Sequence, residues 1–193
     1  KAILVLSDAL RYDVAKDNMG FLSHLVEKKL ASLYKITDDQ FLIQHGRFYT
    51  RDEYPDIELI NTAASLIRRL GPDYLLLHPM GMDYHGEKYG SDSAGYRNHA
   101  IDQDSMLAPF IMEWRERGYV ILVTGDHGIN KDGAHGGTTP EQREVPLFVI
   151  QPEGGGRGDT GQTISQLQIA PTILNVLQIP LPQSMKKPPL DFS

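Results

Sequence analysis

The segment from Thr124 to Gly137, TGDHGINKDGAHGG, carries side chains suited to binding a metal ion. It follows the apolar run YVILV and holds two aspartates, two histidines and five glycines. Glycines permit tight turns, which would let the chain aim Asp126, His127 and His135 at one point. The chain has no cysteine, and imidazole with carboxylate but without thiolate is a donor set typical of Zn²⁺ or Mn²⁺. The segment therefore predicts a metal site at the end of a strand.

Two other acidic residues follow apolar runs elsewhere in the chain. Asp8 comes after AILVLS, and Asp83 comes after LLLHPMGM. Ligands collect outside the carboxyl ends of the strands of an open parallel sheet, so we expect Asp8, Asp83, Asp126 and His127 to share one site. Clustered carboxylates raise each other's pKa unless a cation neutralises them, which again favours a metal. A ligand set this large indicates two ions rather than one.

The elements that must position these residues are visible as alternating patterns. Four short, continuously apolar runs are typical of strands buried on both faces of a sheet: 2–8, 73–79, 119–126 and 145–152. Helical patterns occupy 20–31, 57–71, 96–118 and a segment after the Gly-rich loop at 153–161. Strands alternating with helices predict a layered α/β fold, and the length of 193 residues favours a single domain over 1–193.

Four segments of the chain resemble the alkaline phosphatase superfamily, specifically its nucleotide pyrophosphatase/phosphodiesterase branch. They are SDALRYD, MDYHGEKYG, VTGDHGINKDGAHGGTTPEQREVPLFVI and QLQIAPTILNVLQIPLP. The resemblance implies a three-layer α/β/α sandwich with a mostly parallel central sheet. It also implies two divalent metal ions, zinc in preference to manganese, between a seryl or threonyl nucleophile and the substrate phosphate.

The resemblance assigns most of the acidic and histidine residues to one of the two ions. Asp8, Asp126 and His127 match the ligands of the ion that also binds the nucleophile oxygen. Asp83 and His135 match two ligands of the second ion. These assignments are expectations carried over from the family pattern.

The third ligand of the second ion departs from the family pattern. The family has a histidine four residues after the aspartate, and this chain has Glu87 there, with His85 two residues earlier. Glutamate also ligates zinc or a harder ion. We rank Glu87 above His85 as the ligand, and interpret His85 as a group behind the ligands, a phosphate-facing group or a polar loop residue.

The nucleophile expected from the resemblance is missing. The family pattern places a serine or threonine in a Pro- and Thr-rich helix start well after the first aspartate, and nothing between Leu30 and Tyr54 matches that context. We predict that a segment is lacking near Ile36 and Thr37, and the nucleophile with it. Thr37 is a substitute candidate, and Ser32 a weaker one.

The resemblance predicts a metal-dependent hydrolase of phosphate esters, of the phosphodiesterase or nucleotide pyrophosphatase type, acting on a small substrate such as a nucleotide. A related phosphomutase or sulfatase is an alternative, although the absence of cysteine argues against the commoner sulfatase type. A metal-binding module without catalysis is a further alternative.

Composition excludes other classes of function. A net charge of −6 lacks the basic surface of a duplex-binding protein, so nucleic acid is not an expected partner. No apolar run reaches the ~18 residues of a membrane-spanning helix. No secretory leader is recognisable at the start of the sequence, which favours a cytoplasmic location. Oligomeric state stays open.

Overall fold

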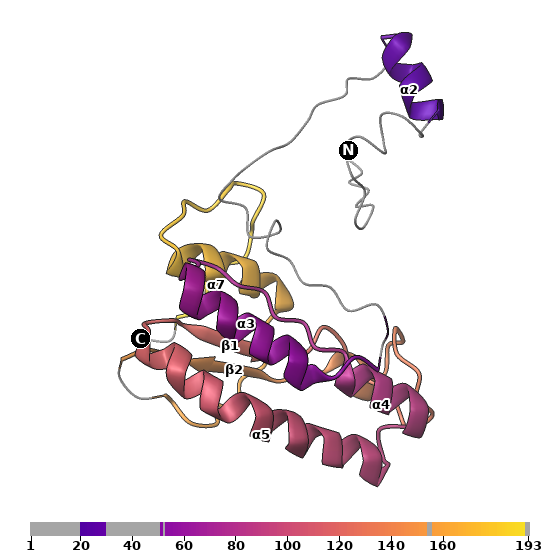
Figure 1. The fold of residues 1–193 in the computed structure, drawn as a ribbon, viewed down its shortest axis with the longest axis vertical. Coiled ribbons are helices and arrows are strands. Elements are labelled where there is room, and N and C mark those ends of the chain that lie inside the picture. Colours follow the sequence, from indigo (N-terminus) through magenta and orange to yellow (C-terminus); the bar gives the residue numbers. More distant parts are fainter. Residues whose placement is uncertain (1–19, 30–50, 52, 154–155, 192–193) are drawn as a thin grey trace. The chain divides into compact units, whose positions relative to one another are not determined.

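The computed structural model describes residues 20–29, 51, 53–153 and 156–191. The chain divides into two compact units, Lys1–Gln44 and His45–Ser193, which are treated separately (Figure 1). The described part of the first unit is centred on helix α2, Gly20–Glu27, within the helix predicted for 20–31. Asp8, Ser32 and Thr37, together with the predicted gap at 36–37, lie outside the described residues.

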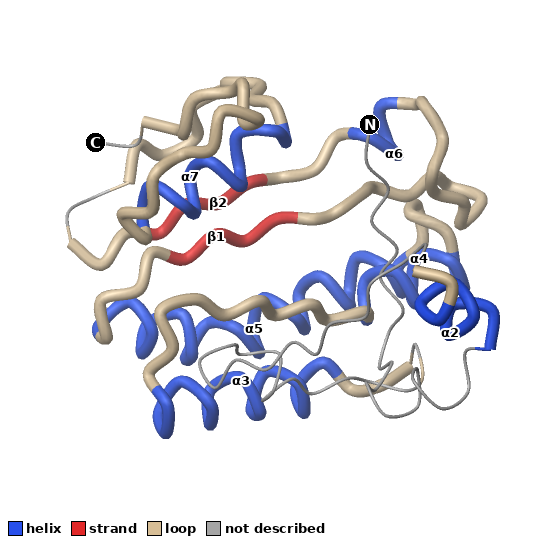
Figure 2. The backbone as a smooth tube through the Cα atoms, turned by 90° about the horizontal axis from the view of Figure 1, so that it is seen from above, coloured by secondary structure: helices blue, strands red, loops and turns tan. Residues whose placement is uncertain are grey.

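The second unit combines helices with a short sheet. Its elements are α3 Asp56–Leu70, α4 Gly81–Tyr89, α5 Ala94–Glu116, β1 Ile121–Thr124, α6 Pro140–Arg143, β2 Leu147–Ile150, the 3₁₀ helix η2 Gln166–Gln168 and α7 Ile169–Val176. Figure 2 shows α3 and α5 on one side of the strand pair and α7 on the other. This mixture of helix and strand agrees with the predicted α/β class. Among the described helices, none has the length and apolar character needed to span a bilayer.

The core of this unit lies between α3, α5 and β1. Helix α3 buries Ile60, Ala64 and Ile67, which recur at three- and four-residue spacing and so share one face. Trp114 of α5 packs against Ala64 and Ile67, with partly buried apolar side chains around them. Helix α3 ends at Gly71, whose φ of 54° and N–H bond to the Ile67 carbonyl form a left-handed cap.

The strand pair differs from the mostly parallel sheet that the sequence predicted. β1 and β2 run antiparallel, with Ile121 opposite Ile150 and Thr124 opposite Leu147. A parallel pair needs a crossover connection, usually a long helix. The connection from β1 to β2 contains only the short helix α6 among its regular elements, and it brings the chain back in the opposite direction.

The apolar run at 73–79, predicted to be a strand, forms none in the structure. Its side chains nevertheless alternate as in a strand, because Leu75 and Leu77 pack on the core while Leu76 is 75% exposed. The described residues contain only the β1–β2 ladder. The three-layer sandwich therefore stays a prediction.

Candidate metal centre

Two of the predicted ligands lie on helix α4, a helix that the sequence patterns did not predict. Asp83 and Glu87 are four residues apart and so project from the same face. The Oδ1 atom of Asp83 is buried and has no hydrogen-bond partner. Buried carboxylate oxygens nearly always have a donor, so this oxygen is suited to a ligand that the protein itself does not supply.

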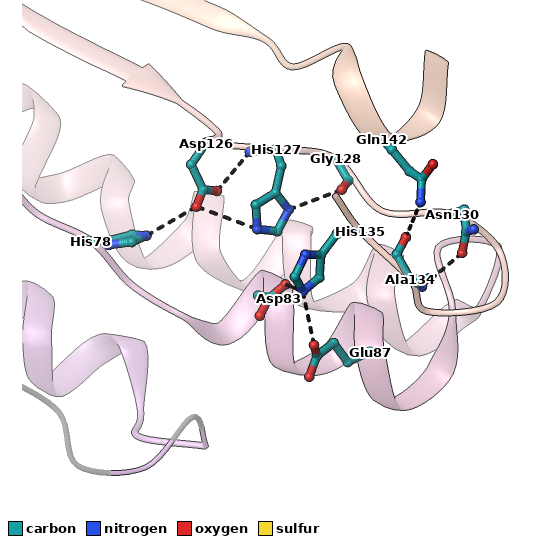
Figure 3. Close-up of polar contacts among 10 residues, drawn as sticks. All are labelled: His78, Asp83, Glu87, Asp126, His127, Gly128, Asn130, Ala134, His135 and Gln142. Atoms are coloured by element: carbon teal, nitrogen blue, oxygen red, sulfur yellow. Dashed lines mark hydrogen bonds and ion pairs between the residues drawn. The ribbon is translucent and has the colours of Figure 1, made fainter. Parts of the chain in front are cut away.

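The loop after β1 brings Asp126, His127 and His135 to the same region as α4 (Figure 3). Asn130 folds the loop back on itself, since its Oδ1 atom accepts hydrogen bonds from the backbone N–H groups of Asp132 and Ala134 at 3.0 and 2.9 Å. The turn requires the positive φ of Gly133, 77°. These contacts place His135 beside the start of the loop, although eight residues of sequence separate it from His127.

Gln142 of α6 holds the other side of this loop. The side-chain Nε2 atom of Gln142 donates to the Ala134 carbonyl at 2.9 Å. The backbone carbonyl of Gln142 accepts the N–H of Gly128 at 3.0 Å. A side chain at Gly128 would collide with the Glu141 carbonyl, so glycine is needed there for the close approach. The sequence patterns above did not point to Asn130 or Gln142, although the Asn-Lys-Asp-Gly stretch is a turn signal that could have indicated Asn130.

The imidazole and carboxylate groups converge closely. The rings of His127 and His135 stack with their centroids 4.3 Å apart. His135 Nε2 lies 3.2 Å from Glu87 Oε1 and 3.9 Å from Asp83 Oδ1. One ligand atom from each of Asp83, His127 and His135 lies within 4.8 Å of the other two. Two donors on a tetrahedral ion with bonds of about 2.1 Å are about 3.4 Å apart, so this spacing fits a metal ion.

Contacts around His127 orient its ring. His127 Nδ1 lies 3.1 Å from the Gly128 carbonyl oxygen, which can only accept, so Nδ1 carries the proton. In the neutral ring the lone pair is then on Nε2, which lies 3.6 Å from Asp126 Oδ2. Asp126 accepts the His127 backbone N–H at 3.0 Å, and its Oδ2 atom lies 3.9 Å from His78 Nε2. Figure 3 shows Asp126 on the His127 side of the cluster and Asp83 with Glu87 on the His135 side.

His85 lies away from this cluster. Its ring stacks on His99 of α5, with centroids 4.3 Å apart and planes 10° from parallel. Burial, followed by the charges of His99 and Lys88, lowers the pKa of His85. Two residues along an α-helix rotate the side chain by about 200°, so Asp83 and Glu87 point one way and His85 the other. The structure thus brings Glu87, and not His85, to His135.

The donor set fits a divalent cation. It combines two imidazoles with carboxylates and includes the unsatisfied oxygen of Asp83. The negative charge of Asp83 also acts on its surroundings, because burial and, second, that charge raise the pKa of Tyr96. A cation would offset the repulsion between neighbouring carboxylates.

Comparisons with known proteins agree with this chemistry. Residues 48–132 match the family model described as type I phosphodiesterase / nucleotide pyrophosphatase. GPI ethanolamine phosphate transferase 2 of Candida albicans is 29% identical over 123 residues, which cover 58% of this chain and 14% of the relative. The catalytic subunit of human GPI ethanolamine phosphate transferase 3 is 26% identical over 113 residues, which cover 57% of this chain and 10% of the relative. No solved structure matches the chain.

These relatives contradict the predicted cytoplasmic location. They are GPI ethanolamine phosphate transferases, which are endoplasmic reticulum membrane proteins. The prediction was wrong because it rested on the lack of a visible leader at the start of the sequence. The chain spans only a small part of the length of the curated relatives it matches, so its first residues are no guide to location.

The family match over residues 48–132 and the relatives therefore show that this part of the chain is similar to the type I phosphodiesterase / nucleotide pyrophosphatase family, in agreement with the motifs around Asp83 and Asp126.

Proposed function

We propose that this chain is the metal-binding part of an enzyme that cleaves phosphodiesters by phosphoryl transfer, using two divalent ions. The observation that carries the proposal is the convergence of Asp83, Glu87, His127 and His135, with a buried carboxylate oxygen left unsatisfied. The family match supports a phosphodiester as the bond that is broken.

The ligands form two groups in the proposal. Asp83, Glu87 and His135 hold one ion, and Asp126 with His127 holds the other; the family pattern adds Asp8 to this second set, and Asp8 lies outside the described residues. Zinc suits the imidazole-containing sets, and manganese is the alternative because Glu87 adds a carboxylate. Bound ions would lower the pKa of a hydroxyl nucleophile and offset the charge that develops on the phosphate.

The chain's own contribution is to hold the donor atoms in place before a substrate arrives. The Gly128 carbonyl fixes the tautomer of His127. Asn130 and Gln142 fix the loop that carries His135. Preorganised groups of this kind do not have to reorient during the reaction, which lowers the barrier.

The nucleophile stays a prediction. It is a serine or threonine in the segment that we infer to be lacking near Ile36 and Thr37, with Thr37 as the substitute candidate. If Thr37 is the nucleophile, the Thr37→Ala variant should bind metal normally and lose turnover.

The acceptor of the phosphoryl group distinguishes two candidate functions. A nucleotide pyrophosphatase or phosphodiesterase transfers the group to water, as the family description suggests for a small substrate such as a nucleotide. A transferase passes it to another acceptor, which the names of the relatives favour, with an ethanolamine phosphate ester as the substrate.

One experiment tests both the metal centre and the acceptor. The protein is stripped with a chelator, reloaded with Zn²⁺, Mn²⁺ or Mg²⁺, and incubated with bis-p-nitrophenyl phosphate in the presence and absence of ethanolamine. We expect bound zinc. Release of nitrophenol that depends on zinc would show that the chain holds a nucleophile, with Thr37 as the candidate, and ³¹P NMR separates the hydrolysis product from a newly formed diester. Failure to bind any of the three ions would contradict the proposal, and binding without turnover would indicate that the nucleophile is lacking or that the chain is the catalytically inactive module.

The three-layer sandwich, as a single domain with a mostly parallel sheet, is part of the same proposal. The inward Leu75 and Leu77 and the outward Leu76 support a further strand at 73–79. Hydrogen exchange checks this: a strand predicts protected backbone amides at alternate positions of 74–77, and rapid exchange throughout would contradict it.

A further inference from the structure

A second cluster of carboxylate and imidazole groups lies behind helix α4 and is not part of the metal centre. At its centre is Asp56, the first residue of α3, whose side chain is only 1% exposed. Its Oδ1 atom accepts the backbone N–H of Gly81 at 3.0 Å. Its Oδ2 atom accepts from Gln103 Nε2 at 2.8 Å and lies 3.0 Å from His99 Nε2. A single buried carboxylate therefore joins α3 to both α4 and α5.

The contact with Gly81 takes the place of a helix cap for α4. Gly81 is the first residue of α4, and the preceding Met80 makes no side-chain cap bond. The first N–H groups of a helix lack intrahelical partners and interact favourably with negative charge. Asp56 supplies both an acceptor and a charge, although 25 residues separate it from Gly81.

The packing around this contact is close. A Cβ atom at Gly81 would collide with His99 Nε2 and Asp56 Oδ2, so only glycine fits. One turn further along α4, His85 stacks on His99 and attaches the same face of the helix to α5. The N-terminal turn of α4 is thus held on one face, whereas Asp83 and Glu87 project from the other.

We propose that Asp56 is a positioning residue for the metal centre. By binding the N-terminus of α4, Asp56 sets the position of the helix along its axis and its rotation about that axis. Both determine whether Asp83 and Glu87 reach His135. Asp83 follows the anchored residue by only two positions, so a shift of Gly81 moves its carboxylate as well. This inference rests on the metal centre under the proposed function, and it assigns Asp56 no contact with metal or substrate.

The test uses Co²⁺ alone as a probe, because its visible absorption reports the geometry of its ligands. Two variants break the contact from opposite sides: Asp56→Ala removes the carboxylate, and Gly81→Ala pushes α4 away while improving the helix propensity of α4 itself. We expect both to weaken Co²⁺ binding by about tenfold to 100-fold, the effect typical of groups that orient metal ligands, and to change the absorption spectrum.

Two further variants separate positioning from general stability. Asp56→Asn keeps an oxygen that accepts the Gly81 N–H but loses the second oxygen, which accepts from Gln103 and lies beside His99 of α5. The unfolding temperature should therefore fall, while the Co²⁺ affinity and the absorption spectrum stay close to those of the wild type. Thr172→Val is the matched control, because Thr172 is fully buried and its hydroxyl bonds Gln168 and Leu190, away from α4. It should lower the unfolding temperature without changing the spectrum.

The outcomes that overturn the inference are distinct. A folded Asp56→Ala or Gly81→Ala protein with wild-type Co²⁺ affinity and spectrum would refute it. So would folded Asp56→Asn and Thr172→Val proteins that both lose Co²⁺ affinity, because the loss would then follow stability and not the α4 contact. If the wild-type chain binds no Co²⁺, the metal centre itself fails and the inference with it.

Discussion

Helix α4 separates two clusters built from the same kinds of side chain. On one face, Asp83 and Glu87 meet two histidines, and a buried oxygen of Asp83 has no donor. On the other face, both oxygens of Asp56 have donors or a histidine at hydrogen-bond distance. Buried polar groups are normally satisfied within the protein. The comparison teaches that the Asp56 carboxylate is satisfied within the fold, whereas the Asp83 carboxylate keeps an oxygen without a donor, for which we propose a metal ion.

The largest effect that would sharpen this comparison is the loss of a ligand from the unsatisfied cluster. We expect His135→Ala to weaken zinc binding by at least about 100-fold, since changing a group that merely orients a ligand already costs up to that much. The apo protein should unfold at nearly the wild-type temperature, because His135 is exposed. Calorimetric zinc titration measures the affinity, with His24→Ala on α2 as a matched control. Equal zinc affinity in the two variants would contradict the ligand role.

The next largest effect concerns the stability that the contacts of Asp56 give to the fold. Gln103→Ala removes one of the donors to Asp56 and should lower the free energy of unfolding of the apo protein by about 1–2 kcal/mol, because a buried acceptor loses its partner. Denaturant unfolding measures the change. Gln162→Ala, at an exposed position, is the control and should have little effect. A Gln103 variant as stable as the control would show that the cluster does not stabilise the fold.

A smaller effect, opposite in sign, is expected at Asp83. Asp83→Asn removes a charge that has no donor at Oδ1 and that lies near Glu87, so the metal-free protein should become more stable by up to about 1 kcal/mol. With saturating zinc the order should reverse, since the wild type gains more binding energy. Thermal unfolding with and without zinc measures both. Destabilisation of the metal-free protein by this change would argue that Asp83 belongs to the fold and not to a ligand site.

The smallest effect concerns a carboxylate at the surface. Glu113 of α5 accepts hydrogen bonds from Arg68 and Arg117, and the Arg68 hydrogen bond is the main cause that lowers the pKa of Glu113. A lowered folded-state pKa gives stability that is present above the ordinary glutamate pKa of about 4.3 and is lost as the pH falls through the folded-state value. The wild type should therefore unfold at a slightly higher temperature than Glu113→Gln at pH 7, and this difference should disappear in acid. A difference that grows in acid would contradict the assignment.

Local patterns in the sequence were sufficient for the main helices and for the apolar runs of β1 and β2. The apolar spacing of α3 and its terminal Gly71 predict a helix with nearly the observed bounds. These signals depend on neighbouring residues and can be recognised without tertiary information. The direction of β2 cannot be predicted in this way, because it depends on the path of the connection between the strands.

The candidate ligands and their grouping were likewise predicted from sequence, by residue type and by the family resemblance, but the local geometry that separates Glu87 from His85 was not. Glu87 and His85 are two residues apart, and only the helical conformation of α4 directs one to His135 and the other to His99. A helix in a Gly-containing segment such as GMDYHGEKY has little intrinsic support, since glycine disfavours helix, so its presence depends on packing.

Asp56 and His99 show what only the tertiary structure decided. In the sequence they are an acidic residue at a helix start and a polar residue within a helix, 43 positions apart, and neither belongs to a motif. Their contact exists because α3 and α5 pack side by side and the first turn of α4 fits between them at Gly81. The sequence alone determined which side chains could bind a metal, because that depends on residue chemistry. Burial and long-range contacts decided which carboxylate was satisfied within the fold and which kept an oxygen without a donor.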